Sequence, residues 1–193
     1  MPYNVASNLD NRDALAILRA IALEYVQSEI RRFHMAHDVI QINPIFGEAS
    51  FAMNKKFVFA LMPFNGEMNA IYTSKIKPCI ENDLGMVVRR ADEFKNANVI
   101  MQDIWKSICE ARIVLADLTG FNPNVMYELG IAHTAGKDTL IIYQNKNSEG
   151  TRFPFDLAHI RRIEYENTMA GGQKLEADLR ETVINILNPT VIT

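Results

Sequence analysis

Between residues 57 and 187, short runs rich in apolar residues alternate with amphipathic segments of helical period. The apolar runs cover residues 57–62, 86–88, 112–117 and 139–143, a fifth strand is predicted at 162–165, and the helical segments cover 68–82, 97–110, 123–135 and 173–187. Runs of this kind are typical of strands buried on both faces, and strands separated by helices form parallel sheets. The pattern therefore predicts an α/β domain with helices on both faces of a five-stranded parallel sheet.

Five strands in this rhythm predict a flavodoxin-like three-layer sandwich with strand order 2-1-3-4-5. Local signals support the boundaries, since Asn122 and Pro123 suit the N-cap and first position of a helix, and Gly136 suits its C-cap. Pro78 is expected to kink or divide the 68–82 helix. A separate apolar stripe at helical spacing predicts an N-terminal helix over 10–33.

The chain is predicted to divide into an N-terminal helix with its connector, residues 1–54, and an α/β domain, residues 55–193. The stripe on the first helix is expected either to cover the α/β domain or to form a contact with a second copy.

Composition narrows the class of protein. A chain of 193 residues with 48% hydrophobic and 22% charged residues is long and apolar enough to fold around one sizeable core. Its net charge of -3 provides no basic field for a phosphate backbone, so duplex nucleic acid is not an expected partner.

The cysteines and the hydropathy pattern bear on the compartment. Cys79 and Cys109 have neither metal-site spacing nor a disulfide pattern, so we expect free thiols and no bound metal. The chain shows no signal-peptide pattern and no run of 18 apolar residues, so no membrane span is expected. Together these features predict a soluble, cytoplasmic protein.

Ligands of open parallel sheets bind outside the carboxyl ends of the strands, beside the point where the strand order reverses. In this order that point lies between strands 1 and 3. The loop after strand 1 supplies five candidate binding residues: Met62, Pro63, Phe64, Asn65 and Gly66. Arg89 and Arg90 follow strand 2 near the same edge, and Arg89 is a candidate for a phosphate, although adjacent arginines often form a solvated strand end.

The segment after strand 3 is polar for a link between two buried elements. Asp117 ends the strand, and its carboxylate is expected either to cap the following turn or to contact a ligand. Asn122 has a sufficient structural role as an N-cap, and Asn124 follows in the first helical turn. Both remain candidate ligand contacts because they begin the helix at the predicted pocket.

Glu128 lies in the second turn of that helix, within the mostly apolar sequence VMYELG. An acid among apolar neighbours is desolvated, and a desolvated carboxylate is costly unless it is paired or used in chemistry. Asp103 lies in the helix before strand 3, where its own sequence context favours an ordinary surface carboxylate. From the residues alone, Glu128 is therefore the stronger candidate of the two.

Three segments carry a resemblance to a known family: FVFALMPF, QDIWKSICEARIVLADLTGFNPNVMYELGIAH and PFDLAHIRRIEY. The region from residue 57 to 165 resembles the nucleoside 2-deoxyribosyltransferase-like group within the TIR-like Rossmannoid set. The specific part is ADLTGFNPNVMYELG, whose NPNV element is more similar to the TIR-like relatives.

The resemblance implies that Glu128 is a nucleophile that attacks the anomeric carbon of a nucleoside or nucleotide. It also implies that Asp103 protonates the departing base and that Asp117 helps to hold the sugar. Carboxylates suit this reaction, because an anion stabilises the positive charge that develops on the sugar and a carboxylic acid protonates the leaving group. No cofactor or metal is expected. The resemblance also implies a homodimer, because members of such families often build their pockets at a dimer contact.

The implied function is cleavage or transfer at an N-glycosidic bond of a nucleoside, nucleotide or NAD-like molecule. Two alternatives remain open at this point. The same pocket of a TIR-like domain binds a nucleotide signal without cleaving it, or the chain is an interaction domain that assembles through its first helix.

Overall fold

The computed structural model describes residues 11–36, 44–47, 51–94, 100–144 and 153–188. The chain divides into two compact units, Met1–Asn43 and Pro44–Thr193. The first unit contains the 26-residue helix α1, Asn11–Ala36. Considered by itself, α1 leaves large apolar side chains exposed, among them Leu18, Ile21 and Tyr25.

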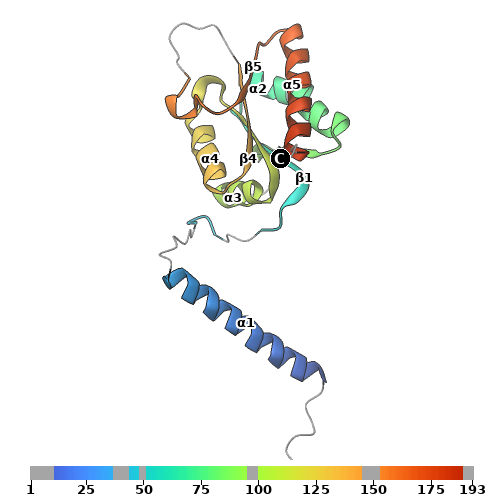
Figure 1. Cartoon of the computed structure of the whole chain (residues 1–193). Helices are drawn as coiled ribbons and strands as arrows, with labels where there is room; N and C mark the ends of the chain where they lie inside the picture. The colour runs from blue at the N-terminus through green and yellow to red at the C-terminus, as the bar shows by residue number, and fades with distance from the viewer. Residues whose placement is uncertain (1–10, 37–43, 48–50, 95–99, 145–152, 189–193) are drawn as a thin grey trace, which may run out of the picture. The chain divides into compact units, whose positions relative to one another are not determined.

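The second unit contains a five-stranded parallel sheet with the order β2-β1-β3-β4-β5 (Figure 1). The strands are β1 (Asn54–Leu61), β2 (Val87–Arg90), β3 (Ala111–Asp117), β4 (Asp138–Gln144) and β5 (Arg162–Tyr165). All four strand pairs are parallel. The predicted flavodoxin-like order is therefore confirmed, and the strand order reverses between β1 and β3.

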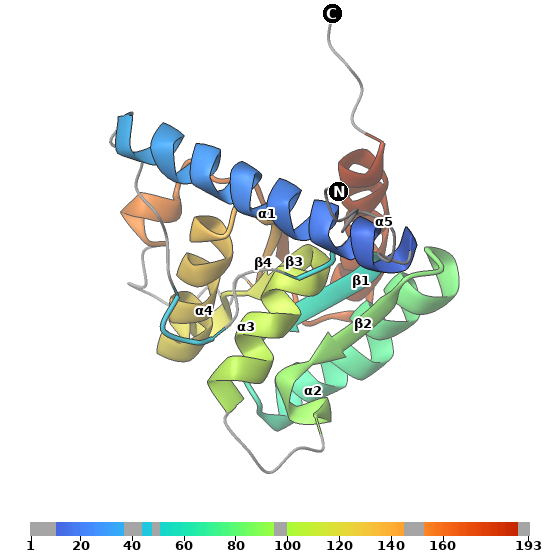
Figure 2. The same ribbon diagram turned by 90° about the horizontal axis from the view of Figure 1, so that it is seen from below.

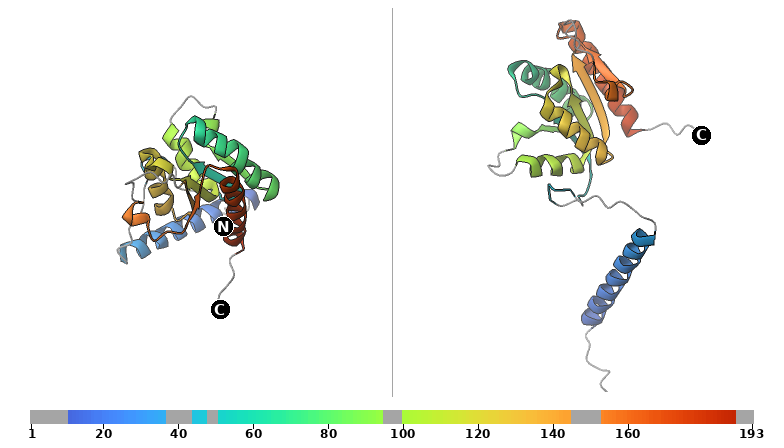
Figure 3. Two further views of the ribbon diagram at one scale, coloured as in Figure 1. Left: turned by 90° about the horizontal axis from the view of Figure 1, so that it is seen from above. Right: turned by 90° about the vertical axis from the view of Figure 1, so that its left-hand side faces the viewer.

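Helices cover both faces of this sheet, as the views of Figures 2 and 3 show. The helices are α2 (Gly66–Ile71), α3 (Ile100–Glu110), α4 (Pro123–Thr134) and α5 (Met169–Leu187). Helices α3 and α4 pack against each other on one face. The segment that begins with α2 covers the other face together with α5. Because successive side chains of a strand point to opposite faces of the sheet, the position of a residue in its strand determines which helices its side chain contacts.

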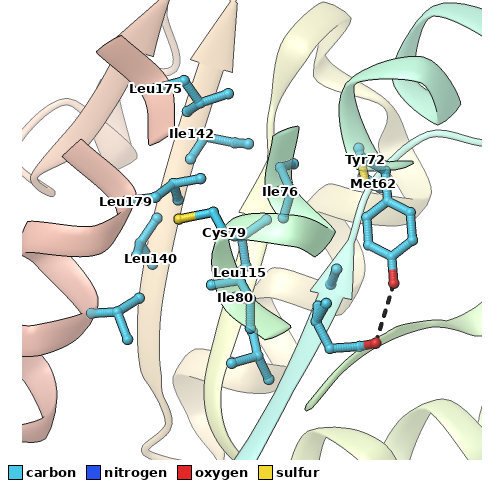
Figure 4. Close-up of a cluster of buried hydrophobic side chains, with 14 of the residues drawn as sticks. Met62, Tyr72, Ile76, Cys79, Ile80, Leu115, Leu140, Ile142, Leu175 and Leu179 are labelled. Atoms are coloured by element: carbon cyan, nitrogen blue, oxygen red, sulfur yellow. Dashed lines mark hydrogen bonds between the residues drawn. The ribbon is translucent and has the colours of Figure 1, made fainter. Parts of the chain in front are cut away.

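Two hydrophobic clusters fill the space between the sheet and its helices. Figure 4 shows part of the cluster on the α2 and α5 face, with Tyr72, Ile76 and Leu115 among the labelled side chains. The Tyr72 hydroxyl donates a hydrogen bond to the Val88 carbonyl oxygen at 3.3 Å. Tyr72 thus connects the helical layer to the edge strand β2.

Helix α2 continues into two π-helical segments, Tyr72–Ile76 and Cys79–Asp83, where the sequence predicted one helix kinked or divided at Pro78. Proline has no amide hydrogen for the helical ladder, and such irregular turns accommodate the missing bond. Asn65 caps the start of α2 by accepting from the Met68 amide at 2.9 Å, so the helix begins two residues before the predicted start.

Helix α5 also begins earlier than predicted, because Thr168 caps it by accepting from the Gly171 amide at 3.0 Å. The glycine pair lies inside the helix. A Cβ on Gly171 would lie 2.2 Å from the Glu166 carbonyl oxygen, so only glycine fits there. Gly136 has φ 67° directly after α4, as expected of a helix C-cap.

Within the described part of the chain, every helix is too short or too polar to cross a membrane.

Candidate functional site

The carboxyl edge of the sheet carries most of the residues that the sequence singled out. Met62 and Pro63 are buried directly after β1, whereas Phe64 is 63% exposed. Asn65 and Gly66 begin α2. The loop after β1 therefore offers one exposed aromatic ring at this edge and otherwise serves to start the helix.

Asp117 is fully buried at the end of β3, with 0% of its surface exposed. One carboxylate oxygen accepts from the Thr119 amide at 2.9 Å, and the other accepts from the Tyr165 hydroxyl at 2.9 Å. Burial raises the pKa of Asp117, while these hydrogen bonds act in the opposite direction. Asp117 thus holds the turn after β3 against β5, which is the structural alternative that the sequence left open.

Further polar side chains surround Asp117 on the α2 and α5 face. The Thr119 hydroxyl accepts a hydrogen bond from the backbone amide of Gln144 at 2.8 Å. Glu67 accepts from the Asn167 side-chain amide at 3.1 Å, and its charge also raises the pKa of Asp117. These contacts tie the carboxyl ends of β3, β4 and β5 to the start of α2, and they leave Asp117 enclosed by protein groups.

Glu128 lies on α4, which packs on the opposite face of the sheet. Its side chain is half-buried, and burial alone raises its pKa to about 7. Within the described residues, no hydrogen bond or ion pair reaches its carboxylate. An acid that is desolvated without a compensating partner is a characteristic of binding and catalytic sites.

Helical geometry shows which flank of α4 carries Glu128. Val125 and Leu129 are buried toward the sheet. On one flank, the His133 Nε2 atom lies 3.1 Å from the Thr139 hydroxyl of β4. With 3.6 residues per turn, Glu128 lies about 140° around the axis from His133, on the flank toward α3. Its place in the second turn keeps it near the carboxyl edge, where α4 begins.

Asp103 lies elsewhere, in a groove of about 350 Å³ along α3 and the edge strand β2. The residues that line this groove are Asn54, Phe57, Val87, Arg89, Phe94, Asp103, Lys106, Ser107 and Glu110. Neither Glu128 nor Asp117 is among them. The structure therefore places the three acids in three different surroundings, rather than around the groove that contains Asp103.

The two adjacent arginines also separate. Both lie inside β2, which extends two residues beyond the predicted run and so directs them to opposite faces. Arg89 is exposed and lines the α3 groove, whereas Arg90 is 4% exposed on the α2 face. Arg90 was therefore not predicted as a site residue. The face of the sheet on which it lies follows from the alternation along β2 only when the end of that strand is known.

The link between β3 and α4 is built mainly by its own backbone. Asn122 caps α4 by accepting from the Asn124 amide at 2.9 Å, and the Asn124 side chain is exposed. Phe121 adopts φ 50°, a left-handed conformation that is rare for a bulky residue. Its ring stacks on Tyr143 with centroids 5.5 Å apart. Apart from the polar character of the loop, no sequence signal points to this strained position.

Among the residues that the structure describes, no three His, Cys, Asp or Glu side chains gather closely enough to hold a metal ion. No protein-family model matches the chain, and a comparison with curated proteins finds no match either.

Proposed function

We propose that the protein cleaves the N-glycosidic bond of a nucleotide-like molecule, with Glu128 as the carboxylate that faces the reacting sugar. The observation that carries this proposal is the half-buried, unpaired carboxyl of Glu128 near the carboxyl edge of a parallel sheet, with its pKa raised to about 7. Such an acid is ionised in part at neutral pH and stabilises positive charge more strongly than an exposed acid does.

The different surroundings of the three acids favour one class of leaving group. A neutral purine or pyrimidine accepts a proton as it departs, which requires an acid near the base. A pyridinium base, as in NAD, carries a positive charge before cleavage and leaves as a neutral molecule. Because Asp117 is enclosed and Asp103 lines a groove that does not include Glu128, a pyridinium nucleotide is the substrate class that the site supports best.

The proposed reaction is hydrolysis. The C1′–N bond breaks with its electron pair going to the pyridinium nitrogen, and Glu128 stabilises or captures the sugar cation. Water then adds to C1′ and loses a proton, which an ionised carboxylate with a pKa near 7 accepts. For NAD the products are nicotinamide, ADP-ribose and a proton.

The test uses chromatography to measure the release of free base from NAD, from deoxynucleosides and from deoxynucleotides. Glu128→Gln keeps the shape of the side chain and removes its charge, so we expect base release to fall at least about a hundredfold. Unchanged turnover by the folded variant would contradict the proposal.

Asp103→Asn is the matched comparison, since it removes a second half-buried acid, the one that the resemblance implies as the proton donor. If the leaving group needs no protonation, this variant keeps most of its turnover of NAD. A loss as large as that of Glu128→Gln would instead favour the two-carboxylate mechanism of a deoxyribosyltransferase-like enzyme.

A nucleotide-binding domain without catalysis is the second candidate. It is favoured by the enclosure of Asp117. Both oxygens of that carboxylate already accept hydrogen bonds, from the Thr119 amide and the Tyr165 hydroxyl, so neither is left for a sugar hydroxyl. A ligand-induced rise in melting temperature with no free base over prolonged incubation would support this candidate over the enzyme.

The proposal includes a cytoplasmic homodimer. The exposed apolar side chains of α1, considered by itself, provide a surface for a second copy, and an isolated helix gains most of its stability from packing. The free thiols Cys79 and Cys109 suit a reducing compartment. Sedimentation of the full chain and of a chain without residues 1–43 measures the contribution of α1 to assembly.

A further inference from the structure

Arg90 is a buried cation at the carboxyl end of the edge strand β2. Its guanidinium group is held on several sides. Nε donates to one oxygen of Asp92 at 3.0 Å, and Nη2 donates to the other at 2.5 Å. Nη2 also donates to the Asn69 side-chain oxygen at 3.0 Å. These bonds fix the plane and direction of the guanidinium group.

Two aromatic rings also contact this guanidinium. Its central carbon lies 4.4 Å from the centroid of the Tyr72 ring and 5.6 Å from that of Phe64. Tyr72 is buried, and Phe64 is exposed. Phe64 is therefore the neighbour with room to turn aside, and it belongs to the loop after β1, at the edge where the strand order reverses.

One nitrogen of Arg90 remains without a partner. Nη1 is buried, and no hydrogen-bond acceptor reaches it in the described structure. A buried donor of a charged group is costly to leave unbonded, and such groups in native proteins call for an explanation. Because the rest of the guanidinium is fixed, Nη1 does not gain an acceptor by rotating the side chain without losing the Asp92 or Asn69 bonds.

We propose that Arg90 Nη1 donates to a phosphate oxygen of the ligand, so that this site takes a 5′-phosphorylated nucleotide and not a nucleoside. Arginine suits phosphate because its planar, always charged group donates along fixed directions. The proposal rests on the proposed function for the identity of the ligand, and on Arg90 alone for the anion. Phe64 turns aside as the phosphate enters.

The experiment compares nicotinamide mononucleotide with nicotinamide riboside, which differ by one phosphate. Binding is measured by calorimetry in the Glu128→Gln background, so that neither ligand is consumed, with inorganic phosphate as a competitor. We expect the phosphorylated ligand to bind at least about tenfold more tightly, as one charge-assisted hydrogen bond allows. Competition by inorganic phosphate identifies the anion itself as the recognised group.

Arg90→Gln is expected to remove this preference. Arg89→Gln is the matched control, since it removes the same charge one residue earlier on the other face of β2, and it should keep the preference. A folded Arg90→Gln variant that retains the full preference would overturn the proposal, as would equal binding of the two ligands before that substitution.

Asp92→Asn tests the same idea without loss of Arg90. It removes the carboxylate that competes for the guanidinium, so the preference for the phosphorylated ligand should increase severalfold. Glu93→Gln is its control, because Glu93 pairs with Lys77 at 2.9 Å and not with Arg90. A preference that falls in Asp92→Asn but not in Glu93→Gln would contradict the assignment.

These outcomes separate the two proposals. If no base is released from any ligand while Arg90→Gln abolishes the phosphate preference, the anion site stands and the hydrolysis fails. If Glu128→Gln stops base release while Arg90→Gln leaves the preference intact, the hydrolysis stands and the anion site fails.

Discussion

At the carboxyl edge of the sheet, the face under α2 and α5 differs from the face under α3 and α4. On the first face, the Asp117 carboxylate is enclosed, and both of its oxygens accept hydrogen bonds. On the second face, the Glu128 carboxylate is half-buried, and no hydrogen bond or ion pair with a described residue reaches it. Burial raises the pKa of both acids, yet only Asp117 has internal donors that compensate for the loss of water.

A raised pKa alone therefore does not distinguish a structural acid from a functional one. Desolvation acts on both side chains, whereas the hydrogen bonds decide whether the charge has a role within the protein. Asp117 stabilises a turn, and Glu128 remains available to a ligand. Four measurements test this contrast between Asp117 and Glu128.

The largest expected effect is on stability at Asp117. Asp117→Ala leaves the Thr119 amide and the Tyr165 hydroxyl without an acceptor in a buried place, so the free energy of unfolding should fall by about 3 kcal/mol. Urea denaturation measures it. Asp156→Ala, at an exposed acid, should change the value by less than about 0.5 kcal/mol. Equal stabilities of the two variants would remove the structural role of Asp117.

The next effect is the pH dependence of base release. In the proposed reaction Glu128 acts as an anion, and its pKa is raised to about 7, so the rate should rise about tenfold per pH unit below 7 and level off above it. Initial rates from pH 5 to pH 9 give the profile. A rate that stays flat between pH 5 and pH 8 would mean that ionisation of Glu128 does not control the reaction.

A smaller loss is expected at Tyr165. Tyr165→Phe removes one of the two donors to Asp117 and should lower the free energy of unfolding by about 1 kcal/mol, less than Asp117→Ala does. Thermal or urea unfolding at neutral pH measures it. Tyr127→Phe is the control, since the Tyr127 side chain is exposed on α4. If both tyrosine variants match the natural protein, the Asp117 contact contributes nothing measurable.

The smallest effect concerns the stability of the Glu128→Gln variant. The folded state holds the Glu128 proton up to about pH 7, whereas the unfolded chain releases it near 4.5, so ionisation opposes folding increasingly as pH rises between these values. The gain in stability from Glu128→Gln should therefore grow by about 1 kcal/mol between pH 4 and pH 8, since solvent screens a half-buried group. A gain in stability that becomes smaller as pH rises would mean that folding lowers the pKa of Glu128 instead of raising it.

Much of the fold follows from sequence pattern. The apolar runs and helical periods identify the five strands and their order, and capping residues such as Asn122 and Gly136 fix the ends of α4. The sequence misplaces boundaries where a local contact overrides the pattern. Thr168 and Asn65 start their helices before the apolar period begins, and β2 runs on through two arginines because pairing with β1 continues to Arg90.

The candidate site was predictable in a more limited way. The carboxyl edge and the two loops that border it follow from the strand order alone. The surroundings of the acids do not, since they depend on partners distant in sequence. Tyr165 lies 48 positions after Asp117, and Asn69 lies 21 positions before Arg90. No spacing rule within one segment reveals such contacts.

Periodicity and capping are local properties, so they suffice to predict from the sequence a parallel α/β sheet with Glu128 near its carboxyl edge. Which polar groups are satisfied depends on the tertiary structure. Hydrogen bonds from the loop and from β5 enclose Asp117, helix packing leaves Glu128 without a partner, and the face of β2 that carries Arg90 leaves its Nη1 unbonded. Desolvation and long-range hydrogen bonding arise when separate segments meet, so they are fixed only by the packed fold.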